Sequence, residues 1–320
     1  MIKQTFSEVR PKDFLLTREG LVFAVVSYKP EDGRFLSFLR YIRSNGGNGW
    51  QKVGTDQANS YLRLHYPDYL IHSRRFDADL HGVPNENIYT HYQPRRKLQD
   101  LLERKETKKK KRIDKLVQLV KLLIDSGISR GSLGITGSYL IGAENENSDF
   151  DLVVYDRDSF EIGRELIKIL IKRGKLASLD HRAWISSYNR RGCSLSLEEY
   201  IWHERRKYNK ALFQGVKFDI SLVTEAEMSS DDVFHKSGHV TITTTVRDAS
   251  QAFETPAIYL LDHPVYRQLI CFTPTYSGQA MRGEKVEIAA LVEKTEDGSK
   301  QRLVVGSSRE AAGEYIKVIR

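Results

Sequence analysis

The sequence predicts an α+β protein of three parts: a central α/β domain built on a mixed sheet, an α+β domain before it and a small β-barrel after it. The chain of 320 residues is longer than one domain usually is. Strand and helix patterns alternate in its middle, and short strands separated by turn residues follow from about residue 232. We therefore expect domains at 1–93, 94–231 and 232–320.

The composition describes a soluble globular protein, with 40% apolar and 29% charged residues. No apolar run approaches the roughly 18 residues of a membrane helix, and the opening MIKQTFSEVRPKDF has charges where a secretory signal needs an apolar core. We expect a cytoplasmic protein without a membrane partner. Cys193 and Cys271 are too few for a disulfide framework. The net charge of +8 favours an anionic partner, either a polynucleotide or a nucleotide phosphate.

The N-terminal domain is predicted to contain a β-hairpin. LVFAVVSY (21–28) is a β-branched and aromatic run, PEDG (30–33) supplies the turn, and RFLSFLRYI (34–42) alternates. ANSYLRLHY is weakly helical up to Pro67, and NIYTHY resembles a short strand. Nothing in this domain indicates a particular chemistry.

The central domain is predicted to contain three long helices. The first runs from Pro94 to Asp125 and includes the run KETKKKKR (105–112), which we interpret as a solvated face or linker in preference to a nucleic-acid contact. The second is SFEIGRELIKILIKRGKL, with Ser159 as the expected N-cap. The third is SLEEYIWHERRKYNKALF (196–213).

Two predicted strands of this domain carry aspartates. Asp149 and Asp151 stand two apart at the start of DLVVYD, so both carboxylates point to one side of the strand. Asp219 lies in the centre of VKFDISLV, which we expect to pair beside the first strand. Like charges held so close are tolerable when a divalent cation lies between them, and Mg²⁺ prefers carboxylate oxygens. Three carboxylates can hold the two ions that assist displacement at phosphorus.

A small-residue turn precedes the aspartates by about ten residues. Gly137 lets the backbone approach a ligand closely, and Ser138 can donate its hydroxyl to a phosphate oxygen. We therefore expect a triphosphate to be bound by this turn at one end and through Mg²⁺ at the other.

Together these motifs resemble the signature of the DNA polymerase β-like nucleotidyltransferases: Gly-Ser or Gly-Gly, about ten residues, Asp-x-Asp on a strand, then a third Asp on a later strand. The matching residues are Gly137, Ser138, Asp149, Asp151 and Asp219. The match spans about residues 113–225 and needs three separated elements to coincide. The resemblance implies Asp149 and Asp151 as metal ligands, and Asp219 as a ligand of the catalytic ion that accepts the proton of the attacking hydroxyl.

A basic segment, HERRKYNK, ends the third predicted helix. Arg205, Arg206 and Lys210 are candidates for binding the triphosphate or an acceptor backbone, and Tyr208 is a candidate for stacking on a base. The alternative is a solvated helix face with Tyr208 packed inward.

The C-terminal domain is predicted to be an OB-like barrel. Its expected strands are HVTITTTV, AIYLL, QLICFTPTY, KVEIAALVE and QRLVVGS. OB-folds often bind oligonucleotides, although a fold alone does not decide function. His235 and His239 have the spacing of a helical zinc pair, but Gly238 interrupts the helix and no third ligand follows.

The function predicted from these features is Mg²⁺-dependent transfer of a nucleoside monophosphate from an NTP such as ATP to a hydroxyl, with release of pyrophosphate. Two Mg²⁺ ions are expected, with Mn²⁺ as the alternative ion. The basic charge and the OB-like barrel favour RNA as the acceptor. Two alternatives stay open: a catalytically inactive nucleic-acid-binding protein, and a transferase that modifies a protein or a small molecule.

Overall fold

A computed structural model of the chain describes residues 8–44, 46, 49–103, 111–224, 232–308 and 311–320. In these ranges the chain forms six α-helices, short 3₁₀ turns and three β-sheets. It divides into two compact units. The first contains the described residues of Met1–Ser73, Asp79–Ala177 and Asn209–Glu227, and the second those of Arg74–Ala78, Ser178–Tyr208 and Met228–Arg320. No helix of the described ranges is long and apolar enough to cross a membrane.

The N-terminal part of the first unit is a sheet packed against one helix. The strand order is β5-β6-β3-β2-β1-β7, and β4 also pairs with β3. The bounds are β1 (Phe14–Thr17), β2 (Val22–Val25), β3 (Arg34–Arg43), β4 (Trp50–Lys52), β5 (Leu70–Ser73), β6 (Ala78–Pro84) and β7 (Ile88–Tyr92). The hairpin predicted for this domain is confirmed by the antiparallel pairing of β2 with β3. Helix α1 (Thr55–His65) buries Ala58 and Leu62 in the same core as Phe23.

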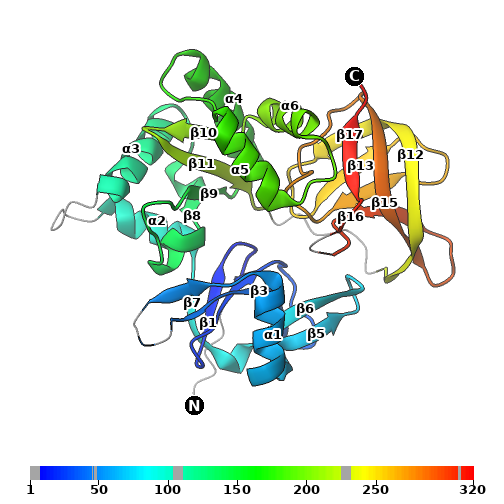
Figure 1. Cartoon of the computed structure of the whole chain (residues 1–320), viewed down its shortest axis with the longest axis horizontal. Coiled ribbons are helices and arrows are strands. Elements are labelled where there is room, and N and C mark those ends of the chain that lie inside the picture. Colours follow the sequence, from blue (N-terminus) through cyan, green and yellow to red (C-terminus); the bar gives the residue numbers. More distant parts are fainter. Residues whose placement is uncertain (1–7, 45, 47–48, 104–110, 225–231, 309–310) are drawn as a thin grey trace. The chain divides into compact units, whose positions relative to one another are not determined.

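The remainder of the first unit is a mixed sheet in the order β10-β11-β9-β8. The bounds are β8 (Leu133–Ile135), β9 (Phe150–Val154), β10 (Lys210–Phe213) and β11 (Val216–Leu222). Strands β9 and β11 are parallel, while the two outer pairs are antiparallel. Helix α4 (Arg157–Lys172) follows β9 and packs on β9, β10 and β11 (Figure 1). The sheet is therefore the mixed sheet that the sequence predicts.

Helix α2 (Pro94–Glu103) packs against β8 at a glycine. A Cβ on Gly134 would lie 2.9 Å from backbone atoms of Pro94 and Arg95, so the helix can approach the strand only where no side chain intervenes. Helix α3 (Lys111–Asp125) buries one face, made by Leu116, Leu119, Val120 and Leu123. Residues 104–110, with most of the lysine run, lie outside the described residues, and so does the predicted domain boundary at 231.

Two details of the predicted helices are corrected. The N-cap of α4 is Asp156, whose Oδ1 accepts from the Ser159 N–H at 2.7 Å, because Ser159 already lies inside the first turn. The helix predicted over 196–213 ends at Lys207, because Tyr208 takes a left-handed conformation (φ +50°) and the chain continues into β10.

The second unit combines two helices with a third sheet (Figure 1). Its elements are α5 (His181–Arg191), α6 (Leu197–Lys207), β12 (Phe234–Gln251), β13 (Ala257–Leu261), β14 (Gln268–Cys271), β15 (Lys285–Thr295), β16 (Gln301–Val305) and β17 (Tyr315–Val318). Long strand β12 pairs with both β13 and β15, so the pairings link β12, β13, β14, β16 and β15 in a ring. Strand β17 also pairs with β15, as β16 does. The α+β class is confirmed, and the predicted central domain 94–231 is divided between the two units.

Candidate active site in the mixed sheet

Two of the three predicted aspartates lie side by side on neighbouring strands. Asp151 of β9 and Asp219 of β11 are register partners in the parallel pair. Neighbouring strands lie about 5 Å apart, and register partners point to the same face of the sheet. The expected pairing of VKFDISLV beside DLVVYD is therefore confirmed, and it brings these two carboxylates together.

The third aspartate is engaged by a lysine. Asp149 lies just before β9, and its Oδ2 accepts from the Lys217 Nζ at 2.6 Å. Lys217 stands two residues before Asp219 on β11, so both side chains point to the face that carries the carboxylates. From the sequence, Lys217 was predicted only as part of the strand VKFDISLV.

Asp151 lies in a strongly unfavourable environment for a negative charge. Burial, followed by the charges of Asp219 and then Asp149, raises the pKa of its carboxyl from 3.8 to about 7. The ammonium groups of Lys12 and Lys217 act in the opposite direction. The site therefore gains from any bound cation that reduces the repulsion between the carboxylates.

The Gly-Ser turn packs directly against Asp151. Gly137 has φ +66°, and a Cβ at this position would lie 2.2 Å from Asp151 Oδ2. Only glycine allows both the left-handed conformation and this close approach. Ser138 follows in a short 3₁₀ turn (Gly137–Ile141), where its side chain is half-buried.

The N-terminal sheet also contributes to the site. The Thr136 N–H donates to the Asp151 carbonyl at 2.9 Å, and the Thr136 hydroxyl donates to the Lys12 carbonyl at 2.8 Å. Lys12 has φ +76°, which is an uncommon conformation for a residue other than glycine. From β3, Tyr41 has a pKa raised by burial and by the charge of Asp151. The sequence carried no signal for either Lys12 or Tyr41, because the contacts depend on how the two sheets of the unit pack.

These residues fit a divalent cation, with a restriction. Asp151 and Asp219 offer hard oxygen donors from adjacent strands, which suits Mg²⁺ or Mn²⁺. Among the described residues, however, no group of three His, Cys, Asp or Glu side chains is arranged to hold a metal ion. Asp149, the third predicted ligand, accepts from Lys217 through its Oδ2. The arrangement therefore supplies two carboxylates for an ion.

The predicted basic residues have different surroundings. Lys210 of β10 is the register partner of Asp219, so it points to the carboxylate face. Arg205 and Arg206 belong to α6 in the second unit, where Arg205 is exposed. Arg206 forms an ion pair with Glu284, and its guanidinium lies 4.5 Å from the centre of the Trp202 ring.

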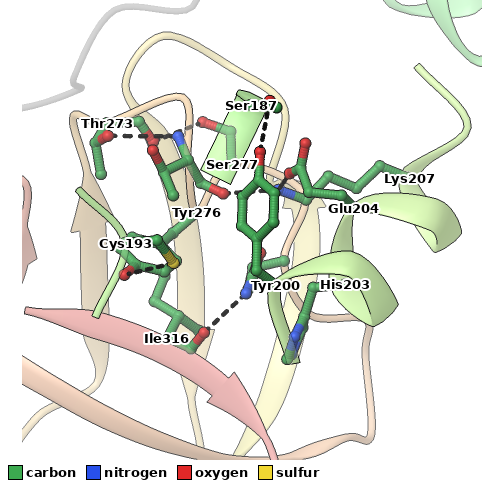
Figure 2. Close-up of polar contacts among 12 residues, drawn as sticks. Ser187, Cys193, Tyr200, His203, Glu204, Lys207, Thr273, Tyr276, Ser277 and Ile316 are labelled. Carbon is green, nitrogen blue, oxygen red and sulfur yellow. Dashed lines mark hydrogen bonds and ion pairs between the residues drawn. The ribbon is translucent and has the colours of Figure 1, made fainter. Parts of the chain in front are cut away.

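Helix α6 is joined to the third sheet by a buried polar network (Figure 2). Lys207 Nζ donates to Glu204 Oε1 at 2.6 Å and to the Thr275 carbonyl at 2.8 Å, and the side chains of both charged residues are 1% exposed. His203 accepts from the Val318 N–H through Nε2 and donates through Nδ1 to the Glu199 carbonyl. Burial lowers the pKa of His203 to about 4, so it stays neutral. This network holds the helix on the sheet.

Other predicted or concave features do not include the aspartates of the candidate site. His235 and His239 are exposed on strand β12, so their spacing does not place them on one face of a helix. Two hollows of about 370 and 510 Å³ are lined by residues of the second unit and of the N-terminal sheet, respectively. Neither lining includes an aspartate of the candidate site.

Comparison with known proteins finds a relative over nearly the whole chain. No protein-family model matches the chain, and no solved structure matches it. The chain is 30% identical to the "Uncharacterized protein MJ1086" of Methanocaldococcus jannaschii, over an alignment that covers 98% of this chain and 100% of that protein.

Proposed function

We propose for this chain, which belongs to the same family as the archaeal protein MJ1086, divalent-cation-dependent transfer of a nucleoside monophosphate from an NTP to a hydroxyl acceptor. The observation that carries the proposal is the in-register pair Asp151 and Asp219, with the Gly137 backbone packed against Asp151. The sequence resemblance to the nucleotidyltransferases rests on the same residues.

Each residue has a defined task in this proposal. Asp151 and Asp219 would hold a divalent cation, Mg²⁺ or Mn²⁺, which lowers the pKa of the attacking hydroxyl and neutralises phosphate charge when bound. Gly137 leaves room for the Asp151 carboxylate beside the turn, and the Ser138 hydroxyl donates to a phosphate oxygen. Lys210, opposite Asp219, attracts the triphosphate.

The proposed reaction is an in-line displacement at the α-phosphorus. The acceptor oxygen forms a bond to this phosphorus, the bond to the oxygen that bridges the α- and β-phosphates breaks, and pyrophosphate leaves with that electron pair. A carboxylate takes the hydroxyl proton, a role that the resemblance gives to Asp219.

RNA is the proposed acceptor. The net charge of +8 favours a polyanion, and the ring of β12, β13, β14, β16 and β15 has the strand number of an OB-fold, the finer assignment that we propose for the second unit. Arg205 and Arg206 remain proposed contacts of the nucleotide or the acceptor. We propose the cytoplasm as the compartment, because NTPs and Mg²⁺ are both available there.

Differential labelling tests this function. The purified protein is incubated with a cell lysate, Mg²⁺ and each NTP, labelled at either the α- or the γ-phosphate, and the RNA, protein and small-molecule fractions are counted. We expect the α label in RNA and the γ label in pyrophosphate, with a loss of at least about 100-fold in Asp151→Asn and Asp219→Asn. Asp100→Asn, an exposed carboxylate on α2, is the matched control and should keep full transfer.

Each outcome of the labelling experiment has a defined meaning. Label in the protein or small-molecule fraction keeps the chemistry and changes the acceptor. RNA binding without transfer, unaffected by the aspartate substitutions, would refute the enzyme and favour the nucleic-acid-binding alternative.

A further inference from the structure

Lys217 contacts Asp149, one of the residues that the sequence predicts as a metal ligand. Its ammonium is 2.6 Å from Asp149 Oδ2, and the two side chains are 14% and 28% exposed. The contact follows from the sheet register: Phe218 pairs with Phe150, so the preceding residues of the two segments are also neighbours. The pair is thus fixed by backbone pairing between β11 and the start of β9, and both side chains remain accessible to a ligand.

An ammonium and a divalent cation compete for the same carboxylate oxygens. Lys carries three donors and a fixed positive charge, but it offers no electron pair to a metal. While Asp149 Oδ2 accepts from Lys217, that oxygen is not available to an ion at Asp151 and Asp219. The described residues contain no group of three His, Cys, Asp or Glu side chains that could hold a metal ion.

The surroundings of Asp151 also include Lys217 as a nearby charge. Lys217 stands two residues before Asp219 on β11, and Asp219 is the register partner of Asp151, so Lys217 points to the face that carries both carboxylates. Lys217 is therefore close enough to act on a triphosphate bound at this carboxylate, as a second cation would.

We propose that Lys217 takes the place of the second divalent cation: the site binds one ion, through Asp151 and Asp219, and the Lys217 ammonium, positioned by Asp149, binds the triphosphate oxygens. This inference rests on the proposed function and departs from the two ions that the sequence predicts. Asp149 is then a positioning residue for a lysine, and no rearrangement of the Asp149–Lys217 pair is needed when the nucleotide binds.

Counting Mn²⁺ ions tests the inference without measuring activity. Equilibrium binding of Mn²⁺ is measured in the presence of a saturating non-hydrolysable NTP analogue, together with the electron paramagnetic resonance spectrum of the bound ions. We expect one protein-bound ion per chain and no spin coupling between ions in the wild type. In Lys217→Met, Asp149 becomes available, so a second ion and a coupled spectrum should appear.

Nucleotide affinity gives a second readout. With one equivalent of Mn²⁺ per chain, the Kd of the analogue should rise about tenfold in Lys217→Met, because a charge-assisted hydrogen bond is lost. Lys217→Arg keeps the charge and should bind one ion. Lys168→Met, which removes an ammonium paired with Glu165 on α4, is the matched control and should leave both readouts unchanged.

The results separate this inference from the proposed function. Two coupled ions in the wild type, or an ion count and analogue affinity that do not respond to Lys217→Met in a folded protein, would overturn the role of Lys217 and leave the transferase intact. A wild-type protein that binds neither Mn²⁺ nor the analogue would overturn both.

Discussion

Replacing Asp151 with asparagine should stabilise the metal-free protein above neutral pH. The fold half-buries this carboxylate beside Asp219 and Asp149, and burial, followed by the charges of these two aspartates, raises its pKa to about 7. Asparagine has a similar shape and no charge. The substitution therefore removes the repulsion and leaves the packing of Gly137 against the side chain in place.

The size and the pH dependence of the effect follow from the pKa of Asp151. Since the folded-state pKa lies above the unfolded-state value of 3.8, the folded protein binds an extra proton between pH 3.8 and about 7, and its free energy of unfolding falls as the pH rises through this window. At 1.36 kcal/mol for each pH unit, the whole window corresponds to roughly 4 kcal/mol. Because Asp151 is partly exposed, solvent screening reduces the expected gain to about 2 kcal/mol above pH 7.

Urea unfolding in EDTA, at several pH values between about pH 4 and about pH 8.5, measures this gain. Hydrogen exchange of peptides from β9 and β11 restricts the readout to the first unit. We expect Asp151→Asn to exceed the wild type in stability at the highest pH and to lose this advantage near pH 4. Asp100→Asn should change stability by less than about 0.5 kcal/mol throughout. An equal stability of wild type and Asp151→Asn at pH 8.5, or a gain that does not depend on pH, would refute the reasoning.

Three further substitutions test other parts of the structure. Gly137→Ala should reduce label transfer at least about 100-fold, because its Cβ would meet Asp151 Oδ2 at 2.2 Å. The control is Gly142→Ala, which has φ +71° and nothing within 4 Å of its Cβ, and it should lose less than about threefold. Equal losses in the two variants would assign the effect to backbone strain. Lys207→Met should lower the free energy of unfolding of the second unit by about 3–5 kcal/mol, because it leaves the Glu204 charge buried without its partner Lys207. Tryptophan fluorescence in urea measures this loss. The double variant Lys207→Met with Glu204→Gln should recover most of it. If the double variant is no more stable than the single one, the two charges are not coupled. Asp156→Ala should cost about 1 kcal/mol in thermal unfolding through loss of the α4 N-cap, and an unchanged melting temperature would contradict the assignment of this cap.

Patterns within short segments predicted much of the fold. The hairpin of β2 and β3, the strands around Asp151 and Asp219, and most strands of the second unit follow from local alternation and turn residues. The end of α6 was not predicted, because Tyr208 adopts a left-handed conformation that its residue type does not favour. Helix α5 and strand β17 were also missed, and each is stabilised by contacts within the second unit.

The candidate site was predicted only in part, because some of its contacts depend on pairing and packing between segments that are distant in the sequence. The spacing of Gly137, Asp151 and Asp219 was enough to predict residues that the sheet places together. The pairing of Asp149 with Lys217 depends on the register between β9 and β11, which the sequence does not specify. The approach of Lys12 to Asp151 depends on packing between the two sheets of the first unit, and neither sheet's sequence indicates that the other packs against it.

Whether Asp151 and Asp219 jointly hold the ion of a nucleotidyltransferase is tested most directly by crystallography with Mn²⁺ and a non-hydrolysable NTP. The anomalous difference map should contain a Mn²⁺ peak about 2.1–2.2 Å from a carboxylate oxygen of each aspartate, with the triphosphate on the side of the Gly137 turn. A nucleotide bound elsewhere, or an ion that contacts neither carboxylate, would contradict the proposed active site.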